Sequence, residues 1–195
     1  MVENISKAEI AELPVEVFDG EISIIQTEKE VEEAMERLKK VTFIGFDTET
    51  RPAFAKGKSY KISLVQLATE HETFLFRLNK IDFPQNLIEL LSNPNVNKIG
   101  LSLKDDFSAI RKRVPDFIPG GFVELQTVAK NAGLKEAGLQ RIYAILFDKK
   151  ISKSQRLSNW DAEELSNAQK MYASIDAWAC LKIYNKLSSL LKNSK

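Results

Sequence analysis

The sequence predicts an α/β fold in which helices flank a mixed sheet. Short apolar runs rich in β-branched and aromatic residues occupy the first half of the chain, and apolar residues at three- and four-residue spacing dominate the second half. The chain has 195 residues, of which 44% are hydrophobic and 28% charged, as is typical of one soluble domain with its own core. We therefore expect one domain over residues 1–195, with a lead-in strand and helix over 1–40 and the core over 41–191.

The individual elements follow from capping residues and apolar spacing. β-branched and aromatic residues predominate in the runs expected to form strands, at residues 22–25, 41–46, 61–68, 73–77 and 98–101. Caps and helical spacing predict helices at residues 6–13, 27–40, 84–91, 103–114, 125–132, 135–147 and 166–191. Early strands, then a strand–helix alternation and a helical tail, indicate a layered α/β fold.

Scarce residue types narrow the possible chemistry. The one cysteine, Cys180, excludes a disulfide framework and a multi-cysteine zinc site, and its apolar helical surroundings predict a core thiol. The one histidine, His71, lies in a polar stretch between two expected strands and is interpreted as an exposed turn residue. A serine or cysteine hydrolase with a histidine base is therefore not expected, whereas carboxylates are abundant.

Charge and targeting signals give broad expectations only. The net charge of +1 neither requires nor excludes a nucleic-acid partner. The sequence shows no leader-like start and no apolar stretch near the ~20 residues that span a bilayer, so we expect a cytoplasmic protein without a membrane partner.

Asp47 and Glu49 form the first acidic element. The period-two alternation of a strand puts both carboxylates on one face, at the end of the most apolar strand in the chain. Two neighbouring carboxylates at the edge of a core need a cation or a proton to compensate them, and hard divalent metals prefer oxygen ligands. The alternative is that these acids cap loops or pair with Arg51.

Helical geometry separates two adjacent aspartates in the second element. Asp106 shares its helix face with Ala109 and Ile110, so we expect it to point inward, whereas Asp105 should point outward. The alternative is that both acids simply favour the positive N-terminal end of a helix.

The third element is a tyrosine and a carboxylate on the last long helix. Tyr172 and Asp176 are four residues apart, so they share a face, and an apolar stripe that includes Cys180 continues along it. A local hydrogen bond between the two side chains is the alternative to an active site.

These three elements occur in an order that resembles the DEDD superfamily of 3′-to-5′ exonucleases, and the spacing of Tyr172 and Asp176 resembles its tyrosine subtype. Residues 43–50 resemble the first motif of the family, and residues 61–68 resemble the strand after it. Residues 156–160 resemble the segment before the third motif in the Werner-syndrome exonuclease-like branch, related to ribonuclease D. Gly100-Leu101-Ser102 departs from many relatives, which carry histidine or asparagine there, and this indicates a subgroup.

The resemblance implies a ribonuclease-H-like fold with about five strands, and a nuclease that acts on DNA or RNA with a free 3′ end. It implies two bound divalent ions, Mg²⁺ or Mn²⁺, and release of nucleoside 5′-monophosphates. The metal ligands it implies are Asp47, Glu49, Asp106 and Asp176. It also implies that Tyr172 orients the attacking water.

Further residues are candidates for substrate contacts. Lys153 and Arg156 could bind the nucleic-acid backbone, and Trp160 could stack on a base or belong to the core. Two alternative functions stay open: a catalytically silent nucleic-acid-binding domain on the same fold, and an RNA-processing exonuclease.

Overall fold

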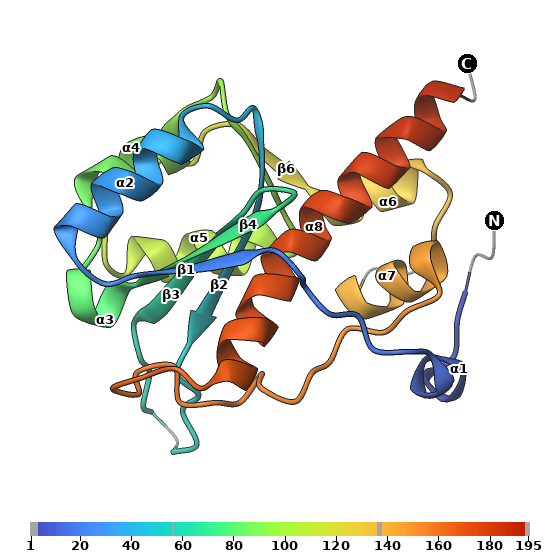
Figure 1. The fold of residues 1–195 in the computed structure, drawn as a ribbon, viewed down its shortest axis with the longest axis horizontal. Helices are drawn as coiled ribbons and strands as arrows, with labels where there is room; N and C mark the ends of the chain where they lie inside the picture. Colours follow the sequence, from blue (N-terminus) through green and yellow to red (C-terminus); the bar gives the residue numbers. More distant parts are fainter. Residues whose placement is uncertain (1–3, 56, 136–137, 194–195) are drawn as a thin grey trace.

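A mixed sheet forms the middle layer of the protein in a computed structural model that describes residues 4–55, 57–135 and 138–193 (Figure 1). Within these residues the sheet has six strands in the order β1-β4-β3-β2-β5-β6. The strands are β1 (Glu21–Ile25), β2 (Phe43–Thr50), β3 (Ile62–Ala68), β4 (Glu72–Arg77), β5 (Asn97–Gly100) and β6 (Phe122–Glu124). The helices are α1 (Lys7–Glu12), α2 (Glu28–Leu38), α3 (Leu78–Ile81), α4 (Gln85–Ser92), α5 (Leu103–Arg111), α6 (Leu125–Asn131), α7 (Leu139–Phe147) and α8 (Asn167–Asn193).

Strand direction brings distant chain segments together at one edge of the sheet. β3 runs antiparallel to β2 and β4, whereas β2, β5 and β6 are parallel to one another. Because parallel strands end at the same edge, the segments that follow β2, β5 and β6 meet there. This edge collects residues from three parts of the sequence.

Helices cover both faces of the sheet. α2, α4 and α5 pack on one face around a core that includes Leu38, Phe46 and Leu91. α8 crosses the other face, with α6 and α7 beside it, and the buried Cys180 belongs to this second core, as expected (Figure 1). In the described part of the chain, no helix has the length and apolarity needed to cross a membrane.

The structure confirms the fold class and corrects several details. The sheet has six strands, one more than expected, because the short β6 pairs with β5. β2 runs on to Thr50, past the expected end at residue 46, so the first acidic element forms the C-terminal part of the strand. The helix expected at residues 135–147 begins at Leu139, and residues 136–137 lie outside the described part. The short α3 was not expected.

Glu16 ties the segment before β1 to the helical side of the molecule. Its carboxylate is 5% exposed and accepts hydrogen bonds from the Tyr143 hydroxyl, from Lys149 Nζ at 2.9 Å and from Lys182 Nζ at 3.1 Å. Burial alone would raise the pKa of Glu16, but these hydrogen bonds and the charge of Lys182 outweigh it and lower the pKa to about 2. The charged form is therefore stabilised in the folded state.

Glu16→Gln should destabilise the protein at neutral pH by roughly 3 kcal/mol, since the pKa falls from 4.5 to about 2 on folding. A lowered pKa stabilises the fold above the unfolded-state value, so this contribution should be lost as the pH falls from about 4.5 toward 2. Urea unfolding of both proteins at pH 7 and pH 3 measures the difference. Glu12→Gln, at an exposed position, is the control and should change the free energy of unfolding little. A loss of unfolding free energy in Glu16→Gln that is as large at pH 3 as at pH 7 would contradict the lowered pKa of Glu16.

Candidate active site

β2 carries the first two carboxylates on the face that α8 covers. Gly45 shares this face with Asp47 and Glu49, and a Cβ on Gly45 would lie 2.0 Å from the Ala177 carbonyl oxygen of α8. Only glycine therefore permits this approach of helix to strand. Since Asp176 precedes Ala177, the approach brings its carboxylate to the end of β2.

α8 also supplies the tyrosine. Tyr172 and Asp176 are 8% and 7% exposed, and the Tyr172 hydroxyl lies close enough to the Asp176 carboxylate to lower its pKa. The Tyr172 ring packs 5.9 Å from the Trp160 ring, centroid to centroid. The phenol is therefore fixed by packing on one side and by Asp176 on the other.

Asp106 reaches the same edge from α5, on the opposite face of the sheet. Its carboxylate accepts a hydrogen bond from Thr48 Oγ1 of β2, and this side chain is partly buried whereas Asp105 is exposed. The two aspartates therefore face as the helical geometry predicted. The start of α5 is unusual because Ser102 has φ +64°, a left-handed conformation that is rare for a residue with a side chain.

Glu124, at the end of β6, compensates this strained start. Its carboxylate accepts hydrogen bonds from the Ser102 and Leu103 backbone N–H groups at 3.1 and 3.0 Å. Backbone N–H groups at a helix start have no partner within the helix, so an acidic acceptor there stabilises it. Glu124 thereby positions the turn of α5 that carries Asp106. The sequence interpretation missed this residue, and its only sequence signal was an acid just before an expected helix.

The four carboxylates perturb one another strongly. Burial raises the pKa of Asp47 well above its usual value, and the charges of Asp176, Asp106 and Glu49 add to this effect. Burial and the charges of Asp176 and Asp106 likewise raise the pKa of Glu49 to about 8, although Arg156 opposes them. The side chains thus share one electrostatic environment.

At Asp106 and Asp176 the main cause of the raised pKa is burial, and neighbouring groups oppose it. Burial raises the pKa of Asp106 to about 6, while the hydrogen bond from Thr48 lowers it. Burial raises the pKa of Asp176 to about 7, while Tyr172 and the charge of Lys153 lower it. The charges of Lys153 and Arg156 thus offset only part of the rise in the pKa values of Asp176 and Glu49.

The donor set fits a hard divalent cation. Four carboxylates from β2, α5 and α8 offer oxygen ligands, and a cation would stabilise their charged forms, which burial disfavours in all four. Among the described residues, no three His, Cys, Asp or Glu side chains already converge closely enough to hold an ion. The Asp106 carboxylate is instead held by Thr48, and the Asp176 carboxylate lies beside Tyr172.

The residues expected to contact the substrate differ in their position relative to the carboxylates. Lys153 and Arg156 lie close enough to Asp176 and Glu49 to lower the pKa of each. Trp160 is 1% exposed, so it cannot stack on a base from solvent, and the core alternative describes it correctly. Its ring packs against Tyr172 because both belong to one apolar cluster.

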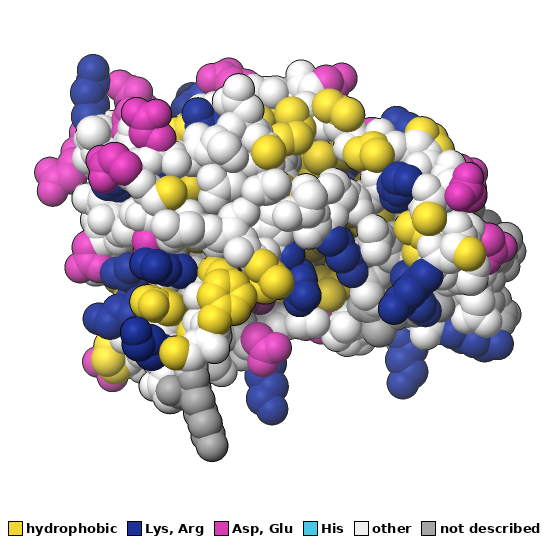
Figure 2. Space-filling model, turned by 90° about the horizontal axis from the view of Figure 1, so that it is seen from below, with side chains coloured by type: hydrophobic (Ala, Val, Ile, Leu, Met, Phe, Trp, Pro, Cys, Tyr) yellow, Lys and Arg dark blue, Asp and Glu magenta, His cyan; other side chains and the backbone are white. Residues whose placement is uncertain are grey.

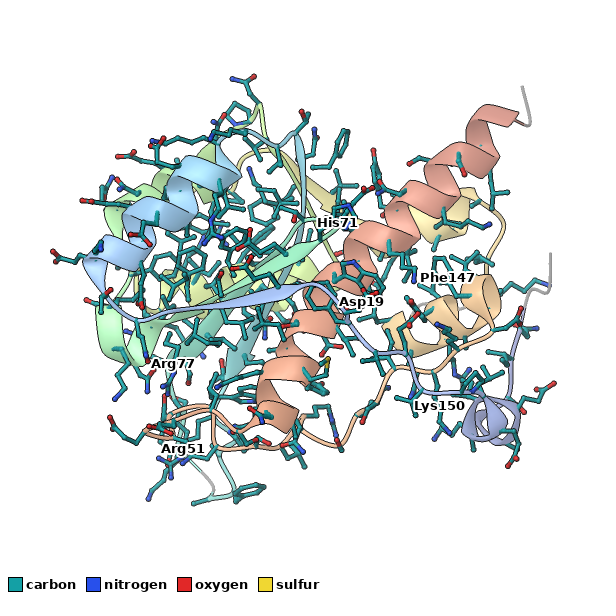
Figure 3. The ribbon with its side chains drawn as sticks, in the orientation of Figure 1. Asp19, Arg51, His71, Arg77, Phe147 and Lys150 are labelled. Atoms are coloured by element: carbon teal, nitrogen blue, oxygen red, sulfur yellow. The ribbon has the colours of Figure 1, made fainter. Side chains whose placement is uncertain are left out.

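Arg77 of β4 fixes the loop that carries Trp160. This buried guanidinium donates hydrogen bonds to the Ala162 and Glu163 backbone carbonyls, and Lys80 pairs with the Glu163 carboxylate. Figure 3 shows Arg77 beside this loop, near the start of α8. The loop is therefore anchored to the sheet, and not only by its own packing.

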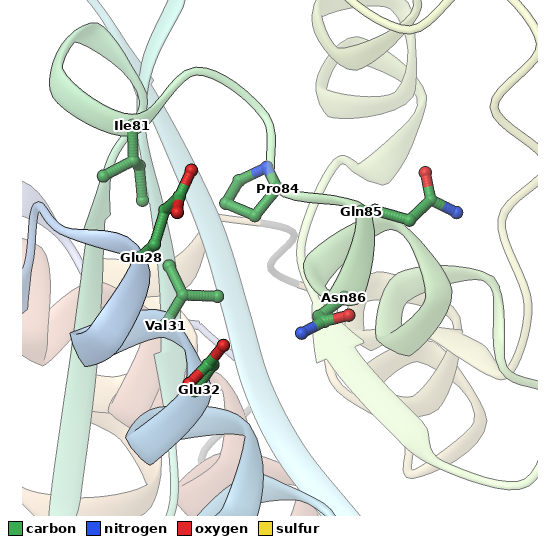
Figure 4. Close-up of a pocket in the computed structure, with 7 residues that line it drawn as sticks. All are labelled: Glu28, Val31, Glu32, Ile81, Pro84, Gln85 and Asn86. Carbon is green, nitrogen blue, oxygen red and sulfur yellow. The ribbon is translucent and has the colours of Figure 1, made fainter.

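Two cavities differ in their relation to the carboxylates. A cavity of about 170 Å³ lies beside them, and its lining includes Asp47, Lys153, Tyr172 and Asp176. A hollow of about 240 Å³ lies between α2 and the α3–α4 segment, and none of the four acids lines it (Figure 4). Its lining residues are Glu28, Val31, Glu32, Ile81, Pro84, Gln85 and Asn86.

Residues 22–192 match a protein family described as 3′-5′ exonuclease. The chain belongs to this 3′-5′ exonuclease family. It is 35% identical over 161 residues to the bifunctional 3′-5′ exonuclease/ATP-dependent helicase WRN of Mus musculus, covering 79% of this chain and 11% of that protein. It is 31% identical over 152 residues to ribonuclease D of Haemophilus influenzae, covering 76% of this chain and 37% of that protein. The chain thus spans a minor part of the length of both relatives.

A solved structure confirms the fold of this exonuclease family in the chain. The crystal structure of the Aedes aegypti Nibbler EXO domain superposes with a TM-score of 0.84 at 20% identity, covering 93% of this chain and 94% of that one. The chain therefore has the ribonuclease-H-like fold expected from the resemblance. Members of the family use divalent metal ions, in agreement with the donor set described above.

Glu124→Ala should remove the carboxylate that holds the first turn of α5. We expect the free energy of unfolding to fall by about 1–2 kcal/mol, as for a lost helix cap. Any nuclease activity should fall as well, because Asp106 loses its fixed position. Chemical denaturation and a nuclease assay measure the two effects. Glu36→Ala, an exposed change on α2, is the control; wild-type activity in Glu124→Ala would show that Asp106 does not depend on this contact.

Proposed function

We propose that this chain is a metal-dependent 3′-to-5′ exonuclease that hydrolyses phosphodiester bonds at the 3′ end of a nucleic acid and releases nucleoside 5′-monophosphates. The observation that carries the proposal is the meeting of Asp47, Glu49, Asp106 and Asp176 at one edge of the sheet in a member of this family. Retention of all four acids and of Tyr172 argues against a catalytically silent binding domain.

The four carboxylates would hold two divalent cations, with Mg²⁺ or Mn²⁺ as the expected ions. Bound there, the ions would supply an activated water and neutralise charge on the phosphate and on the departing 3′ oxygen. The part of the protein is to hold the acids in place. Gly45 sets the distance between β2 and α8, and Glu124 sets the position of α5.

Tyr172 would orient the attacking water through its hydroxyl group. Burial raises the pKa of Tyr172, and the charges of Asp176 and Glu49 raise it further. The phenol therefore stays protonated at neutral pH and acts as a hydrogen-bond donor rather than as a base. Its hydroxyl lies at the Asp176 end of the carboxylate cluster.

A mixed basic and apolar surface next to this cluster would bind the nucleic-acid strand. The end of β2 and the segment before α8 border a hollow of about 310 Å³, whose lining includes Arg51, Phe54, Lys58 and Leu157. Phe54 is 83% exposed, so its ring can stack on a base, the role that the buried Trp160 cannot fill. Figure 2 shows Lys and Arg side chains around hydrophobic ones on the face seen from below.

An RNA substrate is the second candidate within the same activity. The name of the ribonuclease D relative, 31% identical to this chain, favours RNA, whereas WRN is named a helicase and exonuclease. Digestion of 5′-labelled single-stranded, duplex and 3′-recessed DNA and RNA in Mg²⁺ and in Mn²⁺ distinguishes the substrates. A 2′-hydroxyl preference would show as faster loss of the RNA strand.

Asp106→Asn should abolish exonuclease activity, while its neighbour Asp105→Asn should leave it largely intact. Asp106 is partly buried and faces β2, whereas Asp105 is exposed. Shortening of a 5′-labelled strand measures both variants and the wild type. Excess EDTA should stop the wild-type reaction, and added Mg²⁺ or Mn²⁺ should restore it. Full activity in EDTA, or equal losses in both variants, would refute the proposal.

Tyr172→Phe should lower kcat by roughly 10²- to 10⁴-fold, the scale of a lost positioning or acid–base contribution. Its stability should change little, since the ring volume that packs on Trp160 is kept. Tyr143→Phe is the control, because the Tyr143 hydroxyl donates a hydrogen bond to the Glu16 carboxylate, outside the cluster. It should lose stability and keep kcat. A Tyr172→Phe protein with near-wild-type kcat would remove this tyrosine from the mechanism.

A further inference from the structure

Gln66 is a fully buried amide in the central strand β3. It is 0% exposed, and neither its Nε2 nor its Oε1 has a hydrogen-bond partner. The strand register pairs it directly with Asp47 of β2 on one side and with Leu75 of β4 on the other. Directly opposed residues of antiparallel strands point to the same face, with Cβ atoms ~4.5–5.5 Å apart. Gln66 therefore shares the face and the immediate neighbourhood of Asp47.

An unpartnered amide in this position lowers the stability of the fold. A buried polar group that makes no hydrogen bond loses its contacts with water and gains nothing in return, so an apolar residue of the same shape would be favoured. Another pair of polar side chains under α8 is satisfied, since Thr73 Oγ1 donates to Ser174 Oγ at 2.8 Å. Packing alone therefore gives no reason for an amide at residue 66.

Asp47 is the neighbour that could use this amide. Its carboxylate accepts a hydrogen bond from the Thr48 backbone N–H at 2.8 Å. A carboxylate that holds a cation needs its remaining oxygen lone pairs directed by outer hydrogen bonds, and loss of such a partner typically weakens metal binding 10- to 100-fold. An amide N–H donates without adding charge, so it suits a site already crowded with acids.

We propose that Gln66 is a positioning residue for Asp47, and that its amide donates a hydrogen bond to this carboxylate when the cluster binds a divalent cation. The inference rests on the proposed function, because it needs Asp47 to be a cation ligand. Gln66 does not touch the substrate. It fixes the orientation of a ligand and lowers the stability of the protein before the cation binds.

The test compares two buried and unpartnered side chains of the same strand. Gln66→Met keeps the length of the side chain and removes the amide. Ser63→Ala is the matched control, because Ser63 is 1% exposed and its hydroxyl also has no partner, but it lies where β3 shifts register against β2 and is not paired with any of the four acids. The measurements are Tm in EDTA and Mn²⁺ affinity by calorimetric titration without nucleic acid.

We expect Gln66→Met to raise Tm in EDTA by roughly 2–4 °C and to weaken Mn²⁺ binding by about 10- to 100-fold. Ser63→Ala should keep wild-type Mn²⁺ affinity. A lower Tm for Gln66→Met, a Mn²⁺ affinity within twofold of wild type, or an equal loss of Mn²⁺ affinity in Ser63→Ala would each overturn the inference.

Nuclease assays on the same proteins distinguish a failure of the proposed function from a failure of the inference about Gln66. A wild type that binds no Mn²⁺ and cleaves nothing refutes the proposed function, and with it the inference; a wild type that does both, beside an unaffected Gln66→Met, refutes the inference alone.

Discussion

The repulsion among four carboxylates at one edge of the sheet is the constraint on which the rest of this site depends. Burial raises the pKa values of Asp47, Glu49, Asp106 and Asp176, and the charges of neighbouring acids add to this at the first three. Like charges held this closely oppose folding, so their positions must be imposed by the surrounding elements. The site is therefore a property of β2, α5 and α8 jointly, and no single element would create it.

Each of these elements is held by a specific device. Gly45 lets α8 approach β2 more closely than any side chain would permit. Glu124 of β6 holds the strained left-handed start of α5 at Ser102. Arg77 fixes the loop before α8 through two backbone carbonyls. Two of these contacts come from β4 and β6, which lie on opposite sides of β2 in the sheet. The sheet therefore supports the site from both sides.

Local patterns predicted the parts of the structure that depend on local periodicity. The shared face of Asp47 and Glu49, the strands, and the inward side of Asp106 follow from strand and helix geometry. The pairing of the three-residue β6 could not be predicted, because so short a run has no period and depends on β5 for its hydrogen bonds. Trp160 was left open between core and surface, since its burial depends in part on β3 and β4, which are distant in sequence. Glu124 and Gln66 were missed for the same reason: each acts on a residue far away in the chain.

Two glutamates in this protein, the buried Glu16 and the partly buried Glu49, show how surroundings decide the role of a carboxylate. Glu16 has three donors, two of them positively charged, and its pKa falls to about 2. Glu49 has two acids nearby and one opposing arginine, and its pKa rises to about 8. The Glu16 carboxylate has hydrogen-bond donors within the protein, so its substitution is expected to lower the stability of the fold. The Glu49 carboxylate has a charge that the described side chains leave largely uncompensated, so it gains most from a cation supplied by the solution. This difference in pKa, and not burial alone, distinguishes the anchoring carboxylate from those expected to bind metal.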